Sequence, residues 1–304
     1  MSLPIKLKLP EDFLKPEVRC GYEVSAKLKK IWAVELDLLK QLLDVCKKHN
    51  IKIQVFAGTL LGAIRHKGFI PWDDDMDVAM LREDFDKLCV VAKDEFKEPY
   101  FFQTALNDRK YFFGFARLRN GLTTGVISGN ESADYNNGIY IDIFPLDGLP
   151  DSKIWSWIQR RIQVLVVKCC TTYGRAKRKN NHYTEVISRL LRPIIRLLPF
   201  EWWHSLYVGV LTIWTKHSEM LCLRTHFLFG ERYKILKVEL ADTIEVPFEN
   251  LMVPVTRSYD AVLSRIYGDY MEFPSVELRG KWHEGQIHFD PDMPYKEYLK
   301  SQRI

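Results

Sequence analysis

Four aspartates fall within five consecutive positions of this chain, at Asp73, Asp74, Asp75 and Asp77. Like charges this close raise the cost of ionising one another, and a loop that only has to be soluble gains nothing from that repulsion. A hard divalent cation relieves it, because Mg²⁺ typically binds one or two carboxylates together with substrate phosphate oxygens. The cluster therefore predicts a site for a metal ion and a phosphate, and the fold has to hold these side chains together.

A strand, a turn and a short helix are expected directly before the cluster. Apolar residues alternate over 51–55 as in a strand, and an apolar segment over 60–66 suits a short helix. Between them, Gly58 and Thr59 form a small turn. Backbone N–H groups at such a turn can bind a phosphate; Gly58 permits close approach and Thr59 adds a hydroxyl. Both are therefore predicted to bind the phosphate groups of a substrate.

A third carboxylate is expected to join the cluster from another strand. Asp75 and Asp77 lie two positions apart on an extended segment, so their side chains point to the same side. Asp142 is the only acid in the otherwise apolar strand predicted over 139–144. Together the three would form a cradle for two metal ions in an in-line phosphoryl displacement. Each feature alone is weak, since Asp-x-Asp is common in solvated loops and Asp142 could be a structural acid.

The run Gly-Thr-Leu-Leu-Gly-Ala-Ile-Arg-His-Lys-Gly-Phe-Ile-Pro-Trp-Asp-Asp-Asp-Met-Asp, at 58–77, strongly resembles a known signature. It is that of the LicD-type phosphotransferases, a branch of the nucleotidyltransferase superfamily that also includes fukutin-like proteins. Residues 140–147, Tyr-Ile-Asp-Ile-Phe-Pro-Leu-Asp, match the second block of that family. Residues 265–283, which include His283, resemble its closing block. The resemblance spans about residues 30–285.

The resemblance implies a mixed α/β (α+β) fold, with a small nucleotidyltransferase-like sheet flanked by helices. It also implies Mg²⁺, with Mn²⁺ as a substitute, bound by Asp75, Asp77 and Asp142. Asp73 would support these ligands or contact a second metal ion. One carboxylate, with Asp142 as first choice, would take the proton of the acceptor hydroxyl.

The same resemblance implies transfer of a phospho-alcohol from a CDP-alcohol donor, with CDP-choline favoured. The acceptor would be a sugar hydroxyl of a glycan or lipid-linked glycan, such as a teichoic acid precursor. Two alternatives stay open: another CDP-alcohol, carrying glycerol phosphate or ribitol phosphate, and a nucleotide-sugar glycosyltransferase that uses an Asp-x-Asp metal site.

Several basic residues are candidates for binding the donor. Arg65 follows the turn on the short helix and could grip a diphosphate, although a solvated helix end would carry the same residue. Arg117 and Arg119 share one side of a strand and could line the donor cleft, although a plain edge strand would carry them too. The resemblance adds His283 as a substrate contact.

The expected elements divide the 304 residues into three segments. A nucleotidyltransferase-like catalytic core over 22–150 contains a long amphipathic helix, the acidic cluster and strands at 100–104 and 111–118. A helical, basic insertion follows over 151–240. A C-terminal return over 241–304 completes the catalytic domain.

The insertion has an unusual charge balance. Residues 151–240 carry 16 Lys or Arg against 6 Asp or Glu, in a chain whose net charge is +5. Five of the eight tryptophans lie between 153 and 216. Near 187–198 an apolar stripe is expected on one side of a helix, with Arg189, Arg192 and Arg196 on the opposite side. Cationic amphipathic helices rich in Trp and Leu can lie in the plane of an anionic membrane. A helical subdomain packed on the core is the alternative. No nucleic-acid-binding motif accompanies the basic residues, so no nucleic acid partner is expected.

The sequence predicts a cytoplasmic protein, peripheral on the inner face of the cell membrane. It contains no run of apolar residues long enough to span a bilayer, and its first residues lack the apolar core of a signal peptide. The six cysteines show no framework spacing, which is typical of reduced thiols.

Overall fold

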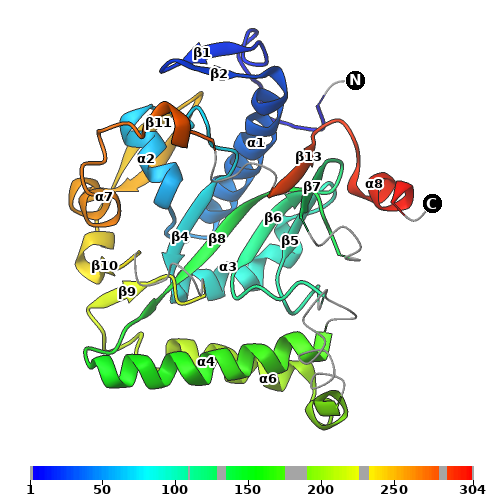
Figure 1. The fold of residues 1–304 in the computed structure, drawn as a ribbon, viewed down its shortest axis with the longest axis vertical. Coiled ribbons are helices and arrows are strands. Elements are labelled where there is room, and N and C mark those ends of the chain that lie inside the picture. Colours follow the sequence, from blue (N-terminus) through cyan, green and yellow to red (C-terminus); the bar gives the residue numbers. More distant parts are fainter. Residues whose placement is uncertain are drawn as a thin grey trace.

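The computed structural model describes residues 3–108, 110–128, 135–174, 190–225, 233–280 and 286–302. A mixed sheet lies at the centre, with helices packed against it (Figure 1). Its main part contains β3, β4, β8, β6 and β5 in that order, with bounds Gln54–Val55, Asp77–Leu81, Ile139–Gly148, Ala116–Asn120 and Tyr100–Gln103. The predicted α+β class, a mixed sheet flanked by helices, is confirmed.

Strand β8 is the axis of this sheet. It pairs in parallel with β4 and antiparallel with β6, and its far end pairs with β9 (Met220–Cys222), which pairs with β10 (Ile235–Leu236). Its isoleucines at 139, 141 and 143 are fully buried, as expected for β-branched residues on a pleated core surface. Because β8 is central, side chains along it meet residues from both neighbouring strands.

Helix α1 (Ala26–Lys48) packs against β8 and β6, and α3 (Arg82–Glu95) packs against β4 and β8. The side chain of Ser25 caps the start of α1 by accepting a hydrogen bond from Leu28 N at 3.2 Å. Two lysines in its last turn favour the negative helix end. The long amphipathic helix predicted in the catalytic core is thus confirmed.

The C-terminal part of the chain returns to the side of the acidic segment, residues 73–77, which carries the aspartate cluster. Helix α2 (Ala57–Arg65) contacts α7 (Tyr259–Tyr267) and the hairpin formed by β11 (Thr243–Phe248) and β12 (Leu251–Thr256). The sequence missed β12. Both hairpin strands contain a proline, which argues against a strand inside a larger sheet but is tolerated in a two-stranded one.

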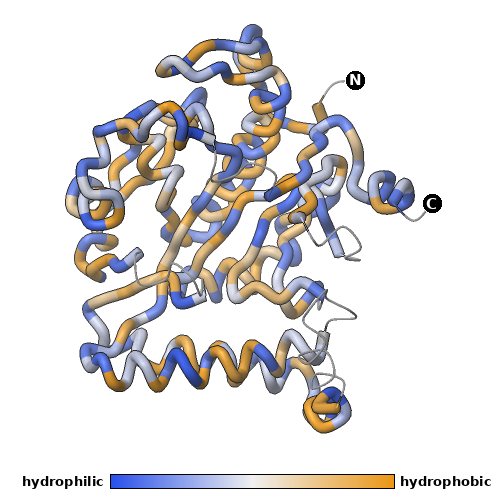
Figure 2. The backbone as a smooth tube through the Cα atoms, in the orientation of Figure 1, coloured by the Kyte–Doolittle hydropathy of each residue, from blue (hydrophilic) through white to orange (hydrophobic). Residues whose placement is uncertain are grey.

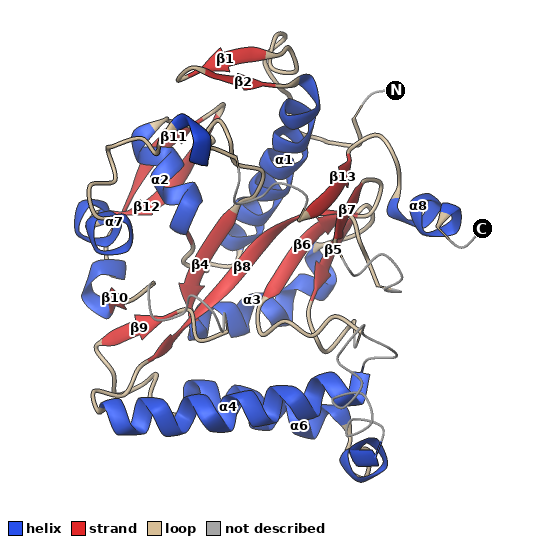
Figure 3. Ribbon diagram, viewed as in Figure 1, coloured by secondary structure: helices blue, strands red, loops and turns tan. Residues whose placement is uncertain are grey.

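Smaller elements surround this core, as the colouring by secondary structure shows (Figure 3). β1 (Glu17–Arg19) and β2 (Tyr22–Val24) form a hairpin before α1, and β7 (Thr124–Ile127) pairs with β13 (Ile287–Asp290). Other small elements among the described residues are the 3-10 turns Lys237–Leu240 and Val276–Leu278 and the C-terminal helix α8, Tyr295–Ser301.

The strand expected over 111–118 begins only at Ala116. The aromatic residues before it do not extend the sheet. Tyr111, Phe113 and Phe115 instead gather around the guanidinium of Arg117, whose carbon lies 4.9–5.6 Å from their ring centres. The aromatic residues at 111–115 predict a strand, but in the structure their rings enclose the buried guanidinium of Arg117.

Two long helices form a separate layer at the edge of the molecule. α4 (Lys153–Gly174) packs against α6 (Phe200–Thr212) (Figure 1). Their contact forms a second apolar cluster, distinct from the main core and including Val166, Phe200 and Tyr207. Figure 2 shows apolar residues interleaved with polar ones along α4. No helix among the described residues is both long and apolar enough to cross a membrane.

The helical character expected for most of residues 151–240 is confirmed where the structure describes it. The same segment also contributes β9 and β10 to the sheet. The division of the chain at 150 and 240 stays a prediction.

Candidate active site

The last residue of the acidic segment, Asp77, pairs with the central strand β8. Asp77 begins β4 and lies opposite Asp142 in the parallel register of β4 and β8. The backbone N–H of Asp142 donates to Met76 O at 2.9 Å, which extends the pairing by one step. The structure therefore brings together two carboxylates that are far apart in the sequence, as the strand assignments predicted.

The first turn of α2 lies against the acidic segment. A Cβ placed on Gly58 would lie 3.1 Å from Asp73 Oδ2, so this glycine allows the Asp73 carboxylate to approach the helix. A carboxylate at a helix N-terminus is stabilised by the partial positive charge there. The signature glycine thus helps the chain to hold a crowded set of acids.

Thr59 joins helix α2 to strand β4. Its Oγ1 accepts a hydrogen bond from the backbone N–H of Asp77 at 2.8 Å. The hydroxyl predicted to bind a phosphate is thus also the anchor that fixes Asp77 relative to α2. Its contact with a substrate stays a prediction.

Electrostatics within the segment favour a cation. Burial raises the pKa of Asp75 well above its ordinary value, and the nearby charges of Asp73, Asp77 and Asp74 raise it further. A carboxyl in this state is costly to ionise without a positive partner. Oxygen-only donors crowded in this way are the ligand chemistry of Mg²⁺ and Mn²⁺.

A further acid, which the sequence reading missed, faces the same region. Glu35 lies on α1, is only 1% exposed, and neither of its carboxyl oxygens has a hydrogen-bond partner. One turn earlier on the same face, Trp32 Nε1 donates to Asp73 O at 2.9 Å. The only sequence signal was an acid among the apolar positions of an amphipathic helix.

Arg117 is the counter-ion of Asp142. Its Nε donates to Asp142 Oδ1 at 2.6 Å and its Nη2 donates to Oδ2 at 3.3 Å. Burial alone would lower the pKa of this guanidinium, but Asp142, together with Tyr140 and Tyr111, raises it above its usual value. The ring centre of Tyr140 lies only 3.8 Å from the guanidinium carbon. Arg117 thus holds Asp142 beside Asp77.

Arg119, two residues further along β6, supports the surrounding structure. It is fully buried and donates to Gln103 Oε1 at 2.5 Å and to Gly138 O at 2.6 Å. Burial, followed by the neighbouring charge of Arg117, lowers its pKa to about 10. Its predicted role in lining the donor cleft is untested.

Arg65 ties the end of α2 to the C-terminal segment. Its Nη1 donates to the carbonyl oxygens of Tyr270 at 2.8 Å and Glu272 at 3.1 Å, and its Nε donates to Nε2 of His66 at 2.9 Å. A grip on a donor diphosphate stays a prediction for this residue. In the structure, the Arg65 side chain links helix α2 to the C-terminal segment through these hydrogen bonds.

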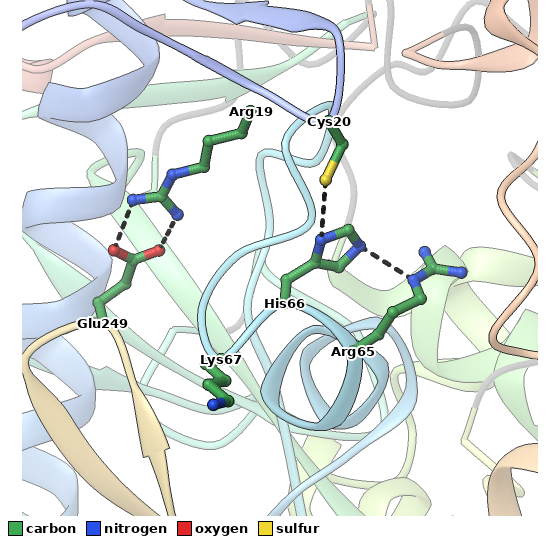
Figure 4. A pocket seen from close by; sticks show the side chains of 6 residues that line it. All are labelled: Arg19, Cys20, Arg65, His66, Lys67 and Glu249. Atoms are coloured by element: carbon green, nitrogen blue, oxygen red, sulfur yellow. Dashed lines mark hydrogen bonds and ion pairs between the residues drawn. The ribbon is translucent and has the colours of Figure 1, made fainter.

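A pocket of about 440 Å³ opens beside the end of α2 (Figure 4). Cys20 Sγ lies 3.7 Å from His66 Nδ1 on one side, and Arg19 forms a two-point ion pair with Glu249 at 2.5 and 2.9 Å on the other. Its lining residues are Arg19, Cys20, Arg65, His66, Lys67 and Glu249. The pocket is predominantly basic and lies next to the signature motif.

Two residues singled out in the sequence, His283 and Arg189, lie outside the described residues. Within the described ranges, no three His, Cys, Asp or Glu side chains are already arranged as the ligands of one ion. The acids nevertheless fit a divalent cation by their chemistry, because a buried carboxylate without a partner adjoins a cluster of like charges.

Comparisons with known proteins identify the domain that carries this site. Residues 50–170 match the family described as LicD/FKTN/FKRP, nucleotidyltransferase domain. Over 253 residues the chain is 28% identical to the lipopolysaccharide cholinephosphotransferase LicD of Haemophilus influenzae, an alignment that covers 82% of this chain and 92% of that protein.

Two shorter matches concern uncharacterised proteins of Rickettsia prowazekii and Rickettsia typhi. Each is 49% identical over 47 residues, which is 16% of this chain and 18% and 15%, respectively, of theirs. The resemblance first noted at residues 58–77 is confirmed by the family match, because residues 50–170 of the chain match the nucleotidyltransferase domain of the LicD/FKTN/FKRP family.

Proposed function

We propose that this protein is a phosphotransferase that moves phosphocholine from CDP-choline to a sugar hydroxyl of a lipid-linked cell-surface glycan, with Mg²⁺ bound at the acidic segment. The observation that carries the proposal is the register pairing of Asp77 with Asp142 inside a LicD/FKTN/FKRP nucleotidyltransferase domain. The name of the Haemophilus relative supports a choline phosphate donor and a glycan acceptor.

In this reaction the acceptor hydroxyl oxygen forms a bond to the phosphorus that carries choline, and the bond to the CMP oxygen breaks. When bound, Mg²⁺ would neutralise the donor diphosphate and the departing CMP. Asp75 and Asp77 would hold the ion, with Asp73 beside them. The backbone N–H groups in the first turn of α2, at Gly58 and Thr59, would bind a phosphate of the donor.

The ion pair with Arg117 fixes the position of the Asp142 carboxylate and bears on its role. Each carboxyl oxygen of Asp142 accepts one hydrogen bond from Arg117, and each oxygen keeps a further lone pair that could bind a cation. We therefore propose that Asp142 holds the cation together with Asp77, and its role as the base that takes the proton of the acceptor hydroxyl stays part of the proposal.

The lipid-linked acceptor would be reached through the α4–α6 layer. The face of α4 opposite α6 exposes Ile154 (71%), Trp157 (58%) and Leu165 (63%). Arg161 and Lys168 lie on that same face by helical spacing and are exposed. Apolar side chains interleaved with cations match an anionic membrane surface, and we propose that this face lies on the inner leaflet.

Helix α6 has a second exposed apolar stripe. Trp202 and Leu206 lie one turn apart, and Ile213 directly follows the helix; these three are 36–62% exposed, on the side opposite the buried Tyr207 and Leu211. Large apolar side chains in contact with water mark an interaction surface. The two helices thus share the character of an interfacial platform.

The test uses purified protein with Mg²⁺ and a panel of CDP-choline, CDP-glycerol, CDP-ribitol and UDP-sugars, in the presence of membranes that contain lipid-linked glycan. Release of CMP from CDP-choline, with phosphocholine found on the glycan and loss of turnover in EDTA, is the expected result. Preference for CDP-glycerol or CDP-ribitol would move the donor to another alcohol. Turnover of a UDP-sugar alone would establish a glycosyltransferase and overturn the proposal.

A further inference from the structure

Glu35 is an unusual residue for the middle of a buried helix face. Its side chain is almost fully enclosed, and neither carboxyl oxygen has a hydrogen-bond partner. Buried carboxylates are otherwise hydrogen-bonded or paired, and a glutamine or leucine would fit the same helix position at lower cost. A residue that costs stability in the protein alone calls for a partner that the chain does not supply.

The orientation of α1 shows where that partner belongs. Trp32 and Glu35 lie three positions apart and therefore share one face of the helix. The indole of Trp32 donates to the carbonyl oxygen of Asp73 at 2.9 Å, which places this face against the acidic segment. The charges that act most strongly on Glu35 are those of Asp74, Asp73, Asp77 and Asp142, after the effect of burial itself.

The neighbouring acid on α1 provides the contrast. Asp37, two residues on, points to another side of the helix and is fully buried as well. It accepts hydrogen bonds from the backbone N–H groups of Lys6 and Leu7, at 3.0 and 2.8 Å, and from Tyr100 OH at 2.7 Å. The helix thus carries one acid that is fully satisfied by the protein and one that is not.

We propose that Glu35 is a further carboxylate ligand of the divalent cation held by the acidic segment, approaching it from the side of α1. This inference rests on the metal dependence in the proposed function. A cation is the one kind of partner that satisfies an enclosed carboxylate and at the same time relieves the repulsion among the aspartates beside it. Glu35 would therefore join the site to the longest helix of the core.

The experiment compares Glu35→Gln with Asp37→Asn, by thermal unfolding in EDTA and in Mg²⁺ and by Mn²⁺ titration followed by electron paramagnetic resonance. Glu35→Gln is expected to melt above wild type in EDTA, because an enclosed acid without partners is gone. It is expected to lose most of the Mg²⁺-dependent rise in Tm and to bind Mn²⁺ at least tenfold more weakly. Asp37→Asn is expected to melt lower in both conditions and to keep the metal response.

Glu35→Asp is the second variant, and it keeps the result interpretable if glutamine disturbs the fold. It retains a carboxylate and should bind Mn²⁺ more tightly than Glu35→Gln. Wild-type Mn²⁺ affinity and an unchanged rise in Tm for Glu35→Gln would overturn the role of Glu35 while leaving the proposed function intact. A wild-type protein that binds no Mn²⁺ would overturn the metal dependence of the proposed function itself, and this inference with it.

Discussion

Arg117 and Asp142 face one another across the antiparallel pair β6–β8 and are joined by hydrogen bonds of 2.6 and 3.3 Å. Arg117 is 4% exposed and its guanidinium is enclosed by aromatic rings. The pair fixes Asp142 beside Asp77, so the central sheet, and not a flexible loop, sets the distance between these two carboxylates of the site.

Replacing Arg117 tests this arrangement. Arg117→Met leaves Asp142 without its counter-ion, and breaking a buried pair typically costs about 3–5 kcal/mol of unfolding free energy. The double variant Arg117→Met/Asp142→Asn removes both charges and should recover much of that stability while staying inactive. Urea unfolding together with CMP release separates the two effects. Wild-type stability of Arg117→Met would show that the pair does not hold the strand register.

Thr59 yields a second prediction. Thr59→Val keeps the shape of the side chain but removes the acceptor for the Asp77 N–H, which lies 2.8 Å away. The expected loss is about 1–2 kcal/mol of stability, with a larger fall in activity, because Asp77 is no longer tied to α2. Thr59→Ser keeps the hydroxyl and serves as the control. Equal activity in the valine and serine variants would contradict an anchoring role.

His66 should make stability depend on pH. Burial, followed by the charges of Arg65 and Arg19, lowers its pKa to about 4, and Arg65 Nε donates to its Nε2. The unfolded chain takes up a proton near the ordinary value of 6.5 while the folded protein does not, so stability falls as the pH drops from about 6.5 toward 4. The measurement is chemical unfolding of wild type and His66→Gln at pH 7, 6 and 5. The variant should lose less stability over this range, and parallel curves would contradict a neutral, half-buried imidazole.

The exposed face of α4 leads to a prediction about membranes. Arg161→Gln/Lys168→Gln removes two cations, each worth about 1 kcal/mol near an anionic surface, so vesicle binding should fall roughly thirtyfold. Adding salt should weaken wild-type binding, because the attraction decays over about 8 Å at physiological ionic strength. Lys87→Gln/Lys93→Gln on α3 is the matched control. Equal sedimentation with anionic and neutral vesicles would return the α4–α6 layer to a packed helical subdomain.

Much of the site could be predicted from local patterns. The acidic run, the turn at Gly58 and the lone acid in an apolar strand were enough to expect that Asp77 and Asp142 would meet. They do so because period-two alternation identifies a buried strand from a short stretch of chain. Long-range partners could not be predicted in this way. The predicted place of Arg117 in the donor cleft stays a prediction, whereas its pairing with Asp142 could not be foreseen, because it depends on the β6–β8 register, which the long connection between these strands leaves open.

The burial of Glu35 also depends on long-range packing and could not be predicted from the local pattern. Glu35 lies among the apolar positions of the predicted helix, but only the packing of α1 against the acidic segment shows that its carboxyl is enclosed there. Strand β12 was missed for a different reason, because Pro254 suppresses the strand signal. Local pattern finds the elements, whereas burial is decided by what packs against them.

Turnover of CDP-choline by Asp75→Asn, Asp77→Asn and Asp142→Asn tests the central claim most directly. Each substitution keeps the size of the side chain and removes a charged ligand. Stabilisation of a transition state by metal is worth several kcal/mol, so each variant should release CMP roughly a thousandfold more slowly than wild type while remaining folded by circular dichroism. Wild-type rates in Asp77→Asn and Asp142→Asn would contradict a phosphotransfer site at the junction of β4 and β8.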